Sequence, residues 1–420
     1  MVSDKVYVYV YLHQYDMPDA KLIGTLTAVM TKNRRGFSFE YNKAWLKSEK
    51  PFFLNPDINW YSGTQYPGNK SNFGIVFDSM PDTWGRTLVK RKMALLDKEN
   101  NQHPRILHDL DFLLAVHDKN RLGALRFKTD KNGDFLDNDD SIAIPPWSYI
   151  RELQYSAKVI EGDENSPELK KWLAILMAPG SSLGGTRPKA NILDITNQAW
   201  IAKFPAKNDT INRALWEYLV YKLALQAGIN MSESKIEKIA GNHHTFFTKR
   251  FDRIKHKRIH FSSAMSLTGN IEEAIKEDIP SYLEIAEFIQ FSGTNIKKEL
   301  HQLWRRIVFN IAISNTDDHM RNHGFILQNG VWHLSPAFDI NPSVDKQGLA
   351  LNIDMENNSL DFELARSVGG YFQLNISQMS KILDEVKTSV RKWHSLAKQL
   401  GIPIKEQEIM KAAFDLDKKN

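Results

Sequence analysis

Two polar clusters joined by a hairpin-like segment constrain this chain most. The first cluster, NTDDHMRN, begins at Asn315, and the second is FDIN, in which Asp339 follows an apolar stretch. Between them, the apolar runs FIL and VWHL flank an Asn-Gly pair at 329–330. This pattern is typical of two short strands joined by a tight turn. We therefore expect a short hairpin that brings the two clusters together.

Asp317 and Asn322 have the spacing of the protein-kinase catalytic loop, in which Asp accepts a hydroxyl proton and Asn binds a metal ion. Asp339 would add a second metal ligand. Magnesium prefers oxygen ligands and keeps several waters, so a carboxylate, an amide oxygen and nucleotide phosphates form a sufficient set. The alternative is that Asp317 and Asp318 only cap a helix or turn.

A glycine-rich segment, PGSSLGGTRPKANIL at 179–193, lies upstream between apolar stretches. Its backbone amides suit phosphate oxygens, although neither a Walker pattern nor G-x-G-x-x-G is present, and a flexible turn is the alternative. Lys203 then closes the run AWIAK and is similar to the strand lysine of kinases, which neutralises phosphates. An exposed strand-end lysine is the simpler interpretation.

Apolar residues recur at helical spacing from Arg213 to Ile229, which predicts a helix carrying Glu217. A helix carboxylate soon after a strand lysine suits a Lys–Glu pair, although a surface role beside Lys222 is equally compatible.

In this order the motifs resemble the HipA family of serine/threonine kinases, the toxin half of bacterial type II toxin–antitoxin pairs. The resemblance covers nearly the whole chain. Its specific segments are SSLGGTRPKA from Ser181, KRFDR from Lys249, TDDHMRN from Thr316, PAFDI from Pro336, and, further upstream, MPDTWGRTLVKRK from Met80 and RLGALRF from Arg121.

The resemblance implies that Asp317 is the catalytic base and that Asn322 and Asp339 bind Mg²⁺. It also implies autophosphorylation at Ser182, with Ser181 as the adjacent candidate. A phosphate adds roughly −1.5 to −2 charge and would repel the nucleotide, which would switch the enzyme off. The nucleotide-binding residues that the resemblance implies are Lys203, Ser182, Gly184, Gly185, Lys249, Phe251, His319, Asn322 and Asp339.

Further expectations follow from the family: ATP and Mg²⁺ as cofactors, a HipB-like DNA-binding antitoxin as partner, and a protein substrate, with an aminoacyl-tRNA synthetase as the implied target. Growth arrest would be the result. The alternative is a catalytically idle scaffold that represses transcription together with the antitoxin. Asp318 departs from several relatives, which have a small residue there, and it either tunes Asp317 or faces solvent.

For the fold, we predict an α+β, protein-kinase-like two-lobed structure with a β-rich N-terminal module and an all-helical C-terminal lobe. The expected domains are a β-rich subdomain at 1–130, a nucleotide-binding lobe at 145–252 and a helical lobe at 253–420. The first is expected to contain short strands and turns. Three segments in the last have helical apolar stripes, at 279–290, 297–313 and 376–400.

Composition sets further limits. The chain has 420 residues and no cysteine, which excludes disulfides, thiolate catalysis and zinc–cysteine sites. It has no signal-peptide pattern and no run of about 18 apolar residues, so we expect a soluble, cytoplasmic protein without membrane contact. His319 and His323 stand four apart, but the glutamate of the H-E-x-x-H zinc motif is missing.

The net charge of +5 is a mild excess. Its densest basic clusters are at 90–92 and 249–260. A basic patch is an electrostatic footprint and not a recognition motif, so contact with DNA mainly through the antitoxin is the favoured interpretation.

Overall fold

The computed structural model describes residues 5–31, 34–47, 52–136, 144–162, 173, 176, 185–272 and 274–419. The chain forms two compact units. Unit 1 comprises 1–208, 249–262 and 326–330, and unit 2 comprises 209–248, 263–325 and 331–420. Both units contain helices and strands, which confirms the predicted α+β class. The predicted three-part division into domains stays a prediction.

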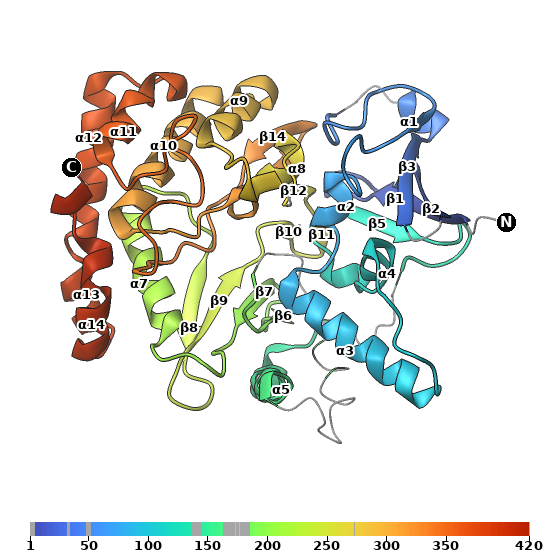
Figure 1. Ribbon diagram of the computed structural model, residues 1–420, viewed down its shortest axis with the longest axis horizontal. Coiled ribbons are helices and arrows are strands. Elements are labelled where there is room, and N and C mark those ends of the chain that lie inside the picture. The colour runs from blue at the N-terminus through green and yellow to red at the C-terminus, as the bar shows by residue number, and fades with distance from the viewer. Residues whose placement is uncertain are drawn as a thin grey trace. The chain divides into compact units, whose positions relative to one another are not determined.

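Unit 1 contains a five-stranded antiparallel sheet in the order β4-β3-β2-β1-β5. Strands β1, β2, β3 and β5 are labelled in Figure 1. Its apolar residues alternate along each strand, so Val8, Val10 and Leu12 of the first strand are buried on one face. They join Phe39 and Phe127 in one core. The strands are β1 (Lys5–Leu12), β2 (Lys21–Thr31), β3 (Arg34–Tyr41), β4 (Thr64–Gln65) and β5 (Leu125–Lys128).

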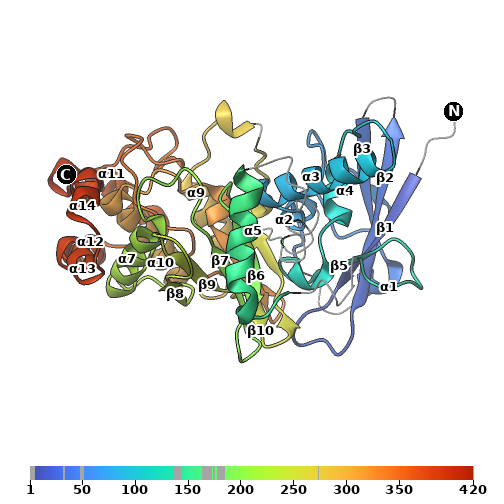
Figure 2. The same cartoon turned by 90° about the horizontal axis from the view of Figure 1, so that it is seen from below.

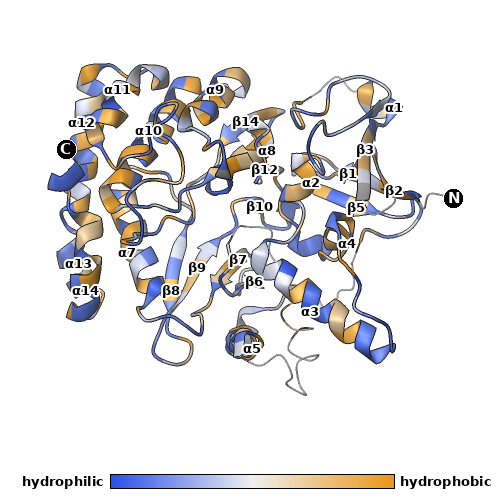
Figure 3. Cartoon of the chain, viewed as in Figure 1, coloured by the Kyte–Doolittle hydropathy of each residue, from blue (hydrophilic) through white to orange (hydrophobic). Residues whose placement is uncertain are grey.

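Helices also lie in this N-terminal region, where the sequence predicted only strands and turns. The longest is α3 (Thr83–Glu99), which begins at Asp82, whose carboxylate accepts a hydrogen bond from the Gly85 amide at 2.8 Å. Polar and apolar residues alternate around it (Figure 3). The other helical segments of unit 1 are α1 (Lys43–Leu46), α2 (Gly74–Asp78), α4 (Asp109–Leu114), η1 (Asp118–Asn120), η3 (Trp147–Tyr149) and α5 (Ile150–Gly162).

A second antiparallel hairpin in unit 1 consists of β6 (Lys189–Leu193) and β7 (Ala199–Lys203). Helix α5 lies beside β6 (Figure 2). This hairpin follows the glycine-rich segment and ends at the lysine that the sequence analysis selected. Three shorter strands come later in the chain: β10 (Arg253–Ile254), β11 (Lys257–Arg258) and β12 (Phe261–Ser263).

Unit 2 is built around α10 (Ile296–Ile313), which is almost entirely buried over its last two turns and packs against α9, α11 and α12. The other elements that lie wholly or mainly in unit 2 are α7 (Arg213–Gln226), β8 (Ser234–Glu237), β9 (Thr245–Lys249), α8 (Ala264–Thr268), η4 (Ala274–Lys276), α9 (Tyr282–Ser292), η5 (Met320–Asn322), β14 (Val331–Leu334), α11 (Phe362–Ser367), η6 (Gly369–Phe372), α12 (Ile376–Val390), α13 (Trp393–Gln399), α14 (Ile404–Met410), η7 (Lys411–Phe414) and η8 (Asp417–Lys419). Strand β13 (Gly324–Gln328) begins in unit 2 and its last three residues belong to unit 1.

The helix predictions for this part of the chain are confirmed, with one difference. Helices α9 and α10 occupy two of the predicted segments, whereas the third segment is divided into α12 and α13 by a break at Arg391–Lys392. The region after Arg253 is mainly helical, but it also contains short strands such as β13 and β14.

The strand–turn–strand pattern between the polar clusters is also confirmed. Asn329 and Gly330 separate β13 from β14 and have φ values of 52° and 79°. Both values lie in the left-handed region, as a two-residue type I′ turn requires. In the part of the chain that the structure describes, no helix combines the length and apolar character needed to span a membrane.

The C-terminal residues of unit 2 are fixed by a buried lysine. The Lys419 ammonium, which is 4% exposed, donates to the carbonyl oxygens of Ala312 at 3.0 Å and Ala413 at 2.6 Å. Ala312 lies in the last turn of α10, where carbonyl groups lack helical partners. Burial lowers the pKa of Lys419 to about 7, although Asp415 acts in the opposite direction.

This lysine makes stability depend on pH. Between about pH 7 and 10.5 the unfolded chain holds a proton that the folded chain has lost, so stability should rise with pH in this window. The slope from one proton is at most about 1.4 kcal/mol per pH unit. Urea unfolding of Lys419→Met at several pH values should show a shallower rise than wild type.

Lys418→Met is the matched control, because the Lys418 side chain is 80% exposed. Equal pH slopes for the two variants would show that the buried lysine is not the cause.

Candidate functional site

The segment after α10 presents Asp317 to solvent. Helix α10 ends at Ser314, whose φ of 52° reverses the chain, and the next amide, of Asn315, donates back to the Asn310 carbonyl at 2.9 Å. Asp317 is exposed and Asn322 is buried. The Asn322 side-chain nitrogen donates to the backbone oxygen of Asp317 at 3.0 Å. The predicted base and the predicted amide ligand are therefore held together by a direct hydrogen bond.

Unlike Asp317, Asp318 points into the interior of unit 2. Its side chain is 3% exposed, so the alternative that it faces solvent is wrong. Its Oδ2 atom accepts a short hydrogen bond from the Tyr282 hydroxyl, and further bonds from Asn310 Nδ2 at 2.7 Å and His323 Nε2 at 2.8 Å. Burial acts to raise the pKa of Asp318, but the charge and hydrogen bond of His323 outweigh it and the pKa is lowered.

Asp339 lies on a segment that is fixed on both sides. Ala337 exchanges backbone hydrogen bonds with Asn230 and Ser232 at 2.8 and 3.1 Å, and the Ser343 amide donates to the Ser314 carbonyl at 3.1 Å. The second of these contacts joins the Asp339 segment to the start of the Asp317 loop. Asp339 itself has a φ of 57°. This conformation is costly for a residue with a side chain, and such residues cluster at functional sites.

Asn322 and Asp339 have the donor chemistry that magnesium prefers. The nitrogen of the Asn322 amide is engaged with Asp317, which leaves the amide oxygen directed elsewhere, and Asp339 Oδ1 accepts from Asn341 Nδ2 at 3.1 Å. The residues that the structure describes contain no group of three or more His, Asp or Glu side chains arranged for a metal ion. Two protein oxygens are too few to complete an octahedron, so phosphates and water would supply the other ligands.

The nucleotide-binding residues expected in unit 1 are described in part. Ser181, Ser182 and Gly184 lie outside the described residues. Gly185 is exposed with a φ of 102°, and Lys203 is half-buried at the end of β7.

The lysine that follows the loop is buried in an ion pair. Lys189 Nζ lies 2.7 Å from Asp82 Oδ2, and the two side chains are 3% and 1% exposed. The Trp84 indole donates to the Lys189 carbonyl at 3.2 Å, and the Trp84 amide donates to the Gly185 carbonyl at 3.4 Å. The loop end is thus fixed to the N-terminus of α3. The MPDTWGR and GGTRPK segments, far apart in sequence, meet here.

Lys249 and Phe251, two of the predicted nucleotide-binding residues, lie beside aromatic rings. Lys249 Nζ lies 6.0 Å from the centre of the Trp200 ring, and the Phe251 ring lies 5.8 Å from that of Phe261. Both side chains are half-buried. Their contact with the nucleotide stays a prediction.

The neighbouring arginines form buried ion pairs. Asp252 accepts from Arg250 at 2.7 Å, from Arg253, and from the Gly123 amide at 2.8 Å. Burial acts to raise the pKa of Asp252, but the charges of Arg250 and Arg253 outweigh it and lower the pKa to about 2. Gly123 has a φ of 73°, and a Cβ there would lie 2.9 Å from the Phe261 amide nitrogen. A glycine is therefore required where these segments meet.

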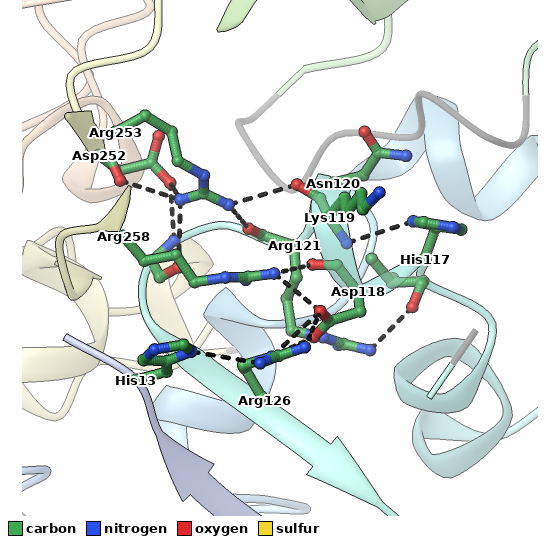
Figure 4. Close-up of polar contacts among 12 residues, drawn as sticks. His13, His117, Asp118, Lys119, Asn120, Arg121, Arg126, Asp252, Arg253 and Arg258 are labelled. Carbon is green, nitrogen blue, oxygen red and sulfur yellow. Dashed lines mark hydrogen bonds and ion pairs between the residues drawn. The ribbon is translucent and has the colours of Figure 1, made fainter. Parts of the chain in front are cut away.

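A second buried carboxylate extends this network. Arg126 and Arg258 point toward Asp118 and lie 2.7 and 2.9 Å from its Oδ2 atom (Figure 4). Three arginines of the basic cluster at 249–260, Arg250, Arg253 and Arg258, are thus engaged in ion pairs inside unit 1. Lys255, His256 and Lys257 are its exposed basic residues.

Comparison with known proteins decides the family. Residues 181–394, about half of the chain, match the model of the HipA-like C-terminal domain. The chain belongs to the HipA-like C-terminal domain family. The matched HipA-like region includes Asp317, Asn322 and Asp339, together with Lys203 and the glycine-rich segment.

Two relatives extend the comparison. A putative kinase of Haemophilus influenzae is 28% identical over 179 residues, which are 38% of this chain and 52% of that protein. The chain thus spans about half the length of this relative. HipA of Shewanella oneidensis MR-1, solved with HipB and its operator DNA, superposes with a TM-score of 0.67 and 17% identity over 97% of this chain and 95% of that chain. This likeness confirms the predicted HipA-type, kinase-like fold.

Sequence reasoning missed the residues that support the site. Asp82 and Asp118 lie upstream of the matched HipA-like region. Tyr282 and Asn310 lie on helices whose apolar stripes predict packing but no polar contact. The only available signal for Asp82 was the resemblance of the MPDTWGR segment, which gave no partner. No spacing rule could pair it with Lys189.

The Lys189–Asp82 pair predicts that the losses of stability in a double-mutant cycle are not additive. Lys189→Met leaves a buried carboxylate without its cation and should lower the free energy of unfolding by about 3–5 kcal/mol. Asp82→Asn keeps the helix cap but leaves the buried lysine without a carboxylate, so the free energy of unfolding should fall by a similar amount. The double variant should be clearly more stable than the sum of the two losses predicts, as measured by urea unfolding.

Lys235→Met provides the comparison, because the Lys235–Glu237 pair is 41% and 38% exposed and should contribute less than about 1 kcal/mol. Additive losses in the double variant would mean that the buried pair is not coupled.

Proposed function

We propose that this chain is an ATP- and Mg²⁺-dependent protein serine/threonine kinase that acts as the toxin of a type II toxin–antitoxin pair. The observation that carries the proposal is the placement of Asp317, exposed to solvent, with its backbone bonded to Asn322 and its loop joined to the Asp339 segment. Phosphoryl transfer needs a base, metal ligands and neutralised phosphates in a fixed arrangement.

Each residue has a defined task in this proposal. Asp317 accepts the proton of the attacking hydroxyl, and Asn322 and Asp339 hold Mg²⁺, which neutralises the phosphate charge when bound. Lys203 and the glycine-rich loop, with Gly184 and Gly185, bind the phosphates. The further proposed nucleotide contacts are Lys249, Phe251 and His319.

The proposed partners follow from the family and from the Shewanella protein, which was solved with HipB and operator DNA. We infer a HipB-like antitoxin that carries the DNA contact. The substrate is proposed to be a component of translation, with an aminoacyl-tRNA synthetase as the first candidate, and growth arrest as the consequence. Action in the cytoplasm belongs to the same proposal.

The second candidate function is a catalytically idle scaffold that acts with the antitoxin as a repressor. The arginines at 249–260 are engaged in ion pairs inside unit 1, which favours contact with DNA through a partner under either function. Retention of Asp317, Asn322, Asp339 and Lys203 favours the kinase.

The deciding experiment is intact mass after incubation with ATP and Mg²⁺. Wild type should gain phosphate, whereas Asp317→Asn should slow the gain at least about 100-fold, because general-base catalysis contributes a factor of that order or more. Asp384→Asn, which changes an exposed aspartate of α12, should behave as wild type. If wild type neither gains phosphate nor carries any at the outset, the scaffold takes precedence.

Ser182→Ala tests the proposed switch. The phosphate gained by wild type should map to Ser182, and activity toward a peptide or protein substrate should decline as that phosphate accumulates. Ser182→Ala should gain no phosphate at this position and should stay active longer. Inactivation at the wild-type rate would exclude Ser182, and a Ser181→Ala variant would then identify the neighbouring serine if it is the true site.

A further inference from the structure

Two adjacent aspartates in the loop after α10 have opposite environments. Asp317 is exposed, whereas the Asp318 side chain is 3% exposed and meets three donors at one oxygen atom. Only the first can reach a substrate hydroxyl. The second needs another explanation, because burying a carboxylate is costly unless its surroundings compensate.

The three donors come from three different parts of unit 2. Tyr282 begins α9, Asn310 lies in the last turn of α10, and His323 follows Asn322 at the end of the loop. One carboxylate oxygen therefore connects two helices and both ends of the loop. A network of this kind fixes orientation, since hydrogen bonds are directional whereas apolar contacts are not.

Each donor is itself held in place. The Tyr282 amide donates to the Asn352 carbonyl at 3.0 Å, and the His323 carbonyl accepts from the Ala264 amide at 2.8 Å. The Asn310 side-chain oxygen accepts from Asn315 Nδ2 at 3.1 Å. Movement of Asp318 would therefore break its contacts to three anchored segments of the unit. The loop between Asn315 and His323 has little freedom in this arrangement.

Alternative roles for Asp318 are less compatible with this geometry. A general base needs a free lone pair directed at its substrate, and a metal ligand needs an oxygen that is not already saturated by donors. Oδ2 is already engaged by three donors, and the burial of the whole side chain, which is 3% exposed, keeps the carboxylate away from a substrate. The bonded pair Asp317–Asn322 lies immediately beside it in the chain.

We propose that Asp318 is a positioning residue for the phosphoryl transfer proposed above: its Oδ2 atom, held by Tyr282, Asn310 and His323, fixes the loop so that Asp317 and Asn322 keep their catalytic placement. The inference rests on the proposed function. Misplacement of a reacting group by about 1 Å can cost on the order of 100-fold in rate, so a carboxylate that touches no substrate can control kcat.

The test compares Asp318→Asn with Glu299→Gln in kinase assays. Glu299 is a matched control, because it is also a buried carboxylate of unit 2, on the same helix as Asn310, and accepts from the Leu334 amide at 3.1 Å beside His333. Asp318→Asn should lower kcat by about 10- to 100-fold with the KM for ATP changed less than about twofold. Glu299→Gln should leave kcat within about twofold of wild type, even if it loses as much stability against urea as Asp318→Asn does.

Tyr282→Phe keeps the shape of the ring and removes one donor, so it should lower kcat in the same direction by a smaller factor. It carries the test if Asp318→Asn does not fold. If both Asp318→Asn and Tyr282→Phe retain the wild-type kcat, or if Glu299→Gln loses as much kcat as Asp318→Asn, the positioning role is overturned.

Hydrogen exchange of the loop separates failure of this inference from failure of the proposed function. Asp318→Asn and Tyr282→Phe should speed amide exchange in the peptide that contains 315–323, whereas Glu299→Gln should not. If wild type lacks kinase activity but the loop loosens as described, the proposed function fails while Asp318 still orders the loop. Unchanged exchange in both loop variants would overturn the inference whatever the activity.

Discussion

Buried carboxylates that remain charged are the constraint on which both units depend. An ionised carboxylate is stable away from water only where several donors or cations converge on it. Asp252 and Asp118 in unit 1 meet arginines, and Asp318 in unit 2 meets a hydroxyl, an amide and an imidazole. Such groups are a poor source of net stability, but their directional bonds allow few alternative arrangements of the segments that supply them.

Buried carboxylates also hold together segments of unit 1 that lie far apart in the sequence. The region matched by the HipA-like model begins at 181, yet the end of the glycine-rich loop is held by Asp82, and the segment after β9 is held by Asp118 and the Gly123 amide. The N-terminal segments therefore support the end of the glycine-rich loop and the segment after β9 through buried polar contacts. This gives a physical reason why MPDTWGR and RLGALRF accompany the kinase motifs in one chain.

Much of the fold could be predicted from periodicity, because an apolar stripe at helical spacing must be buried. Helices α9 and α10 and the Asn-Gly turn follow from such local patterns. Local patterns failed where long-range contacts decide the structure. The helix at 83–99 has a weak apolar stripe and begins at its Asp82 cap. The arginines of KRFDR look like surface charge, because the backbone oxygens of Asn120 and Gly123 that accept from Arg250 and Arg253 lie 130 residues upstream. The same limit applies to the site: Asp317 and Asn322 share a readable spacing, whereas the donors to Asp318 come from positions 282, 310 and 323.

The distribution of charge also bears on how such a chain could meet DNA. Binding to phosphates depends on cations that can release counterions at the surface. The sequence carries a net charge of +5, but Arg250, Arg253 and Arg258 are each paired with a buried aspartate. These arginines serve folding, and their guanidinium groups are occupied by protein acceptors. The net charge already includes their aspartate partners, so what limits contact of these arginines with DNA is their placement inside the unit and not a loss of charge.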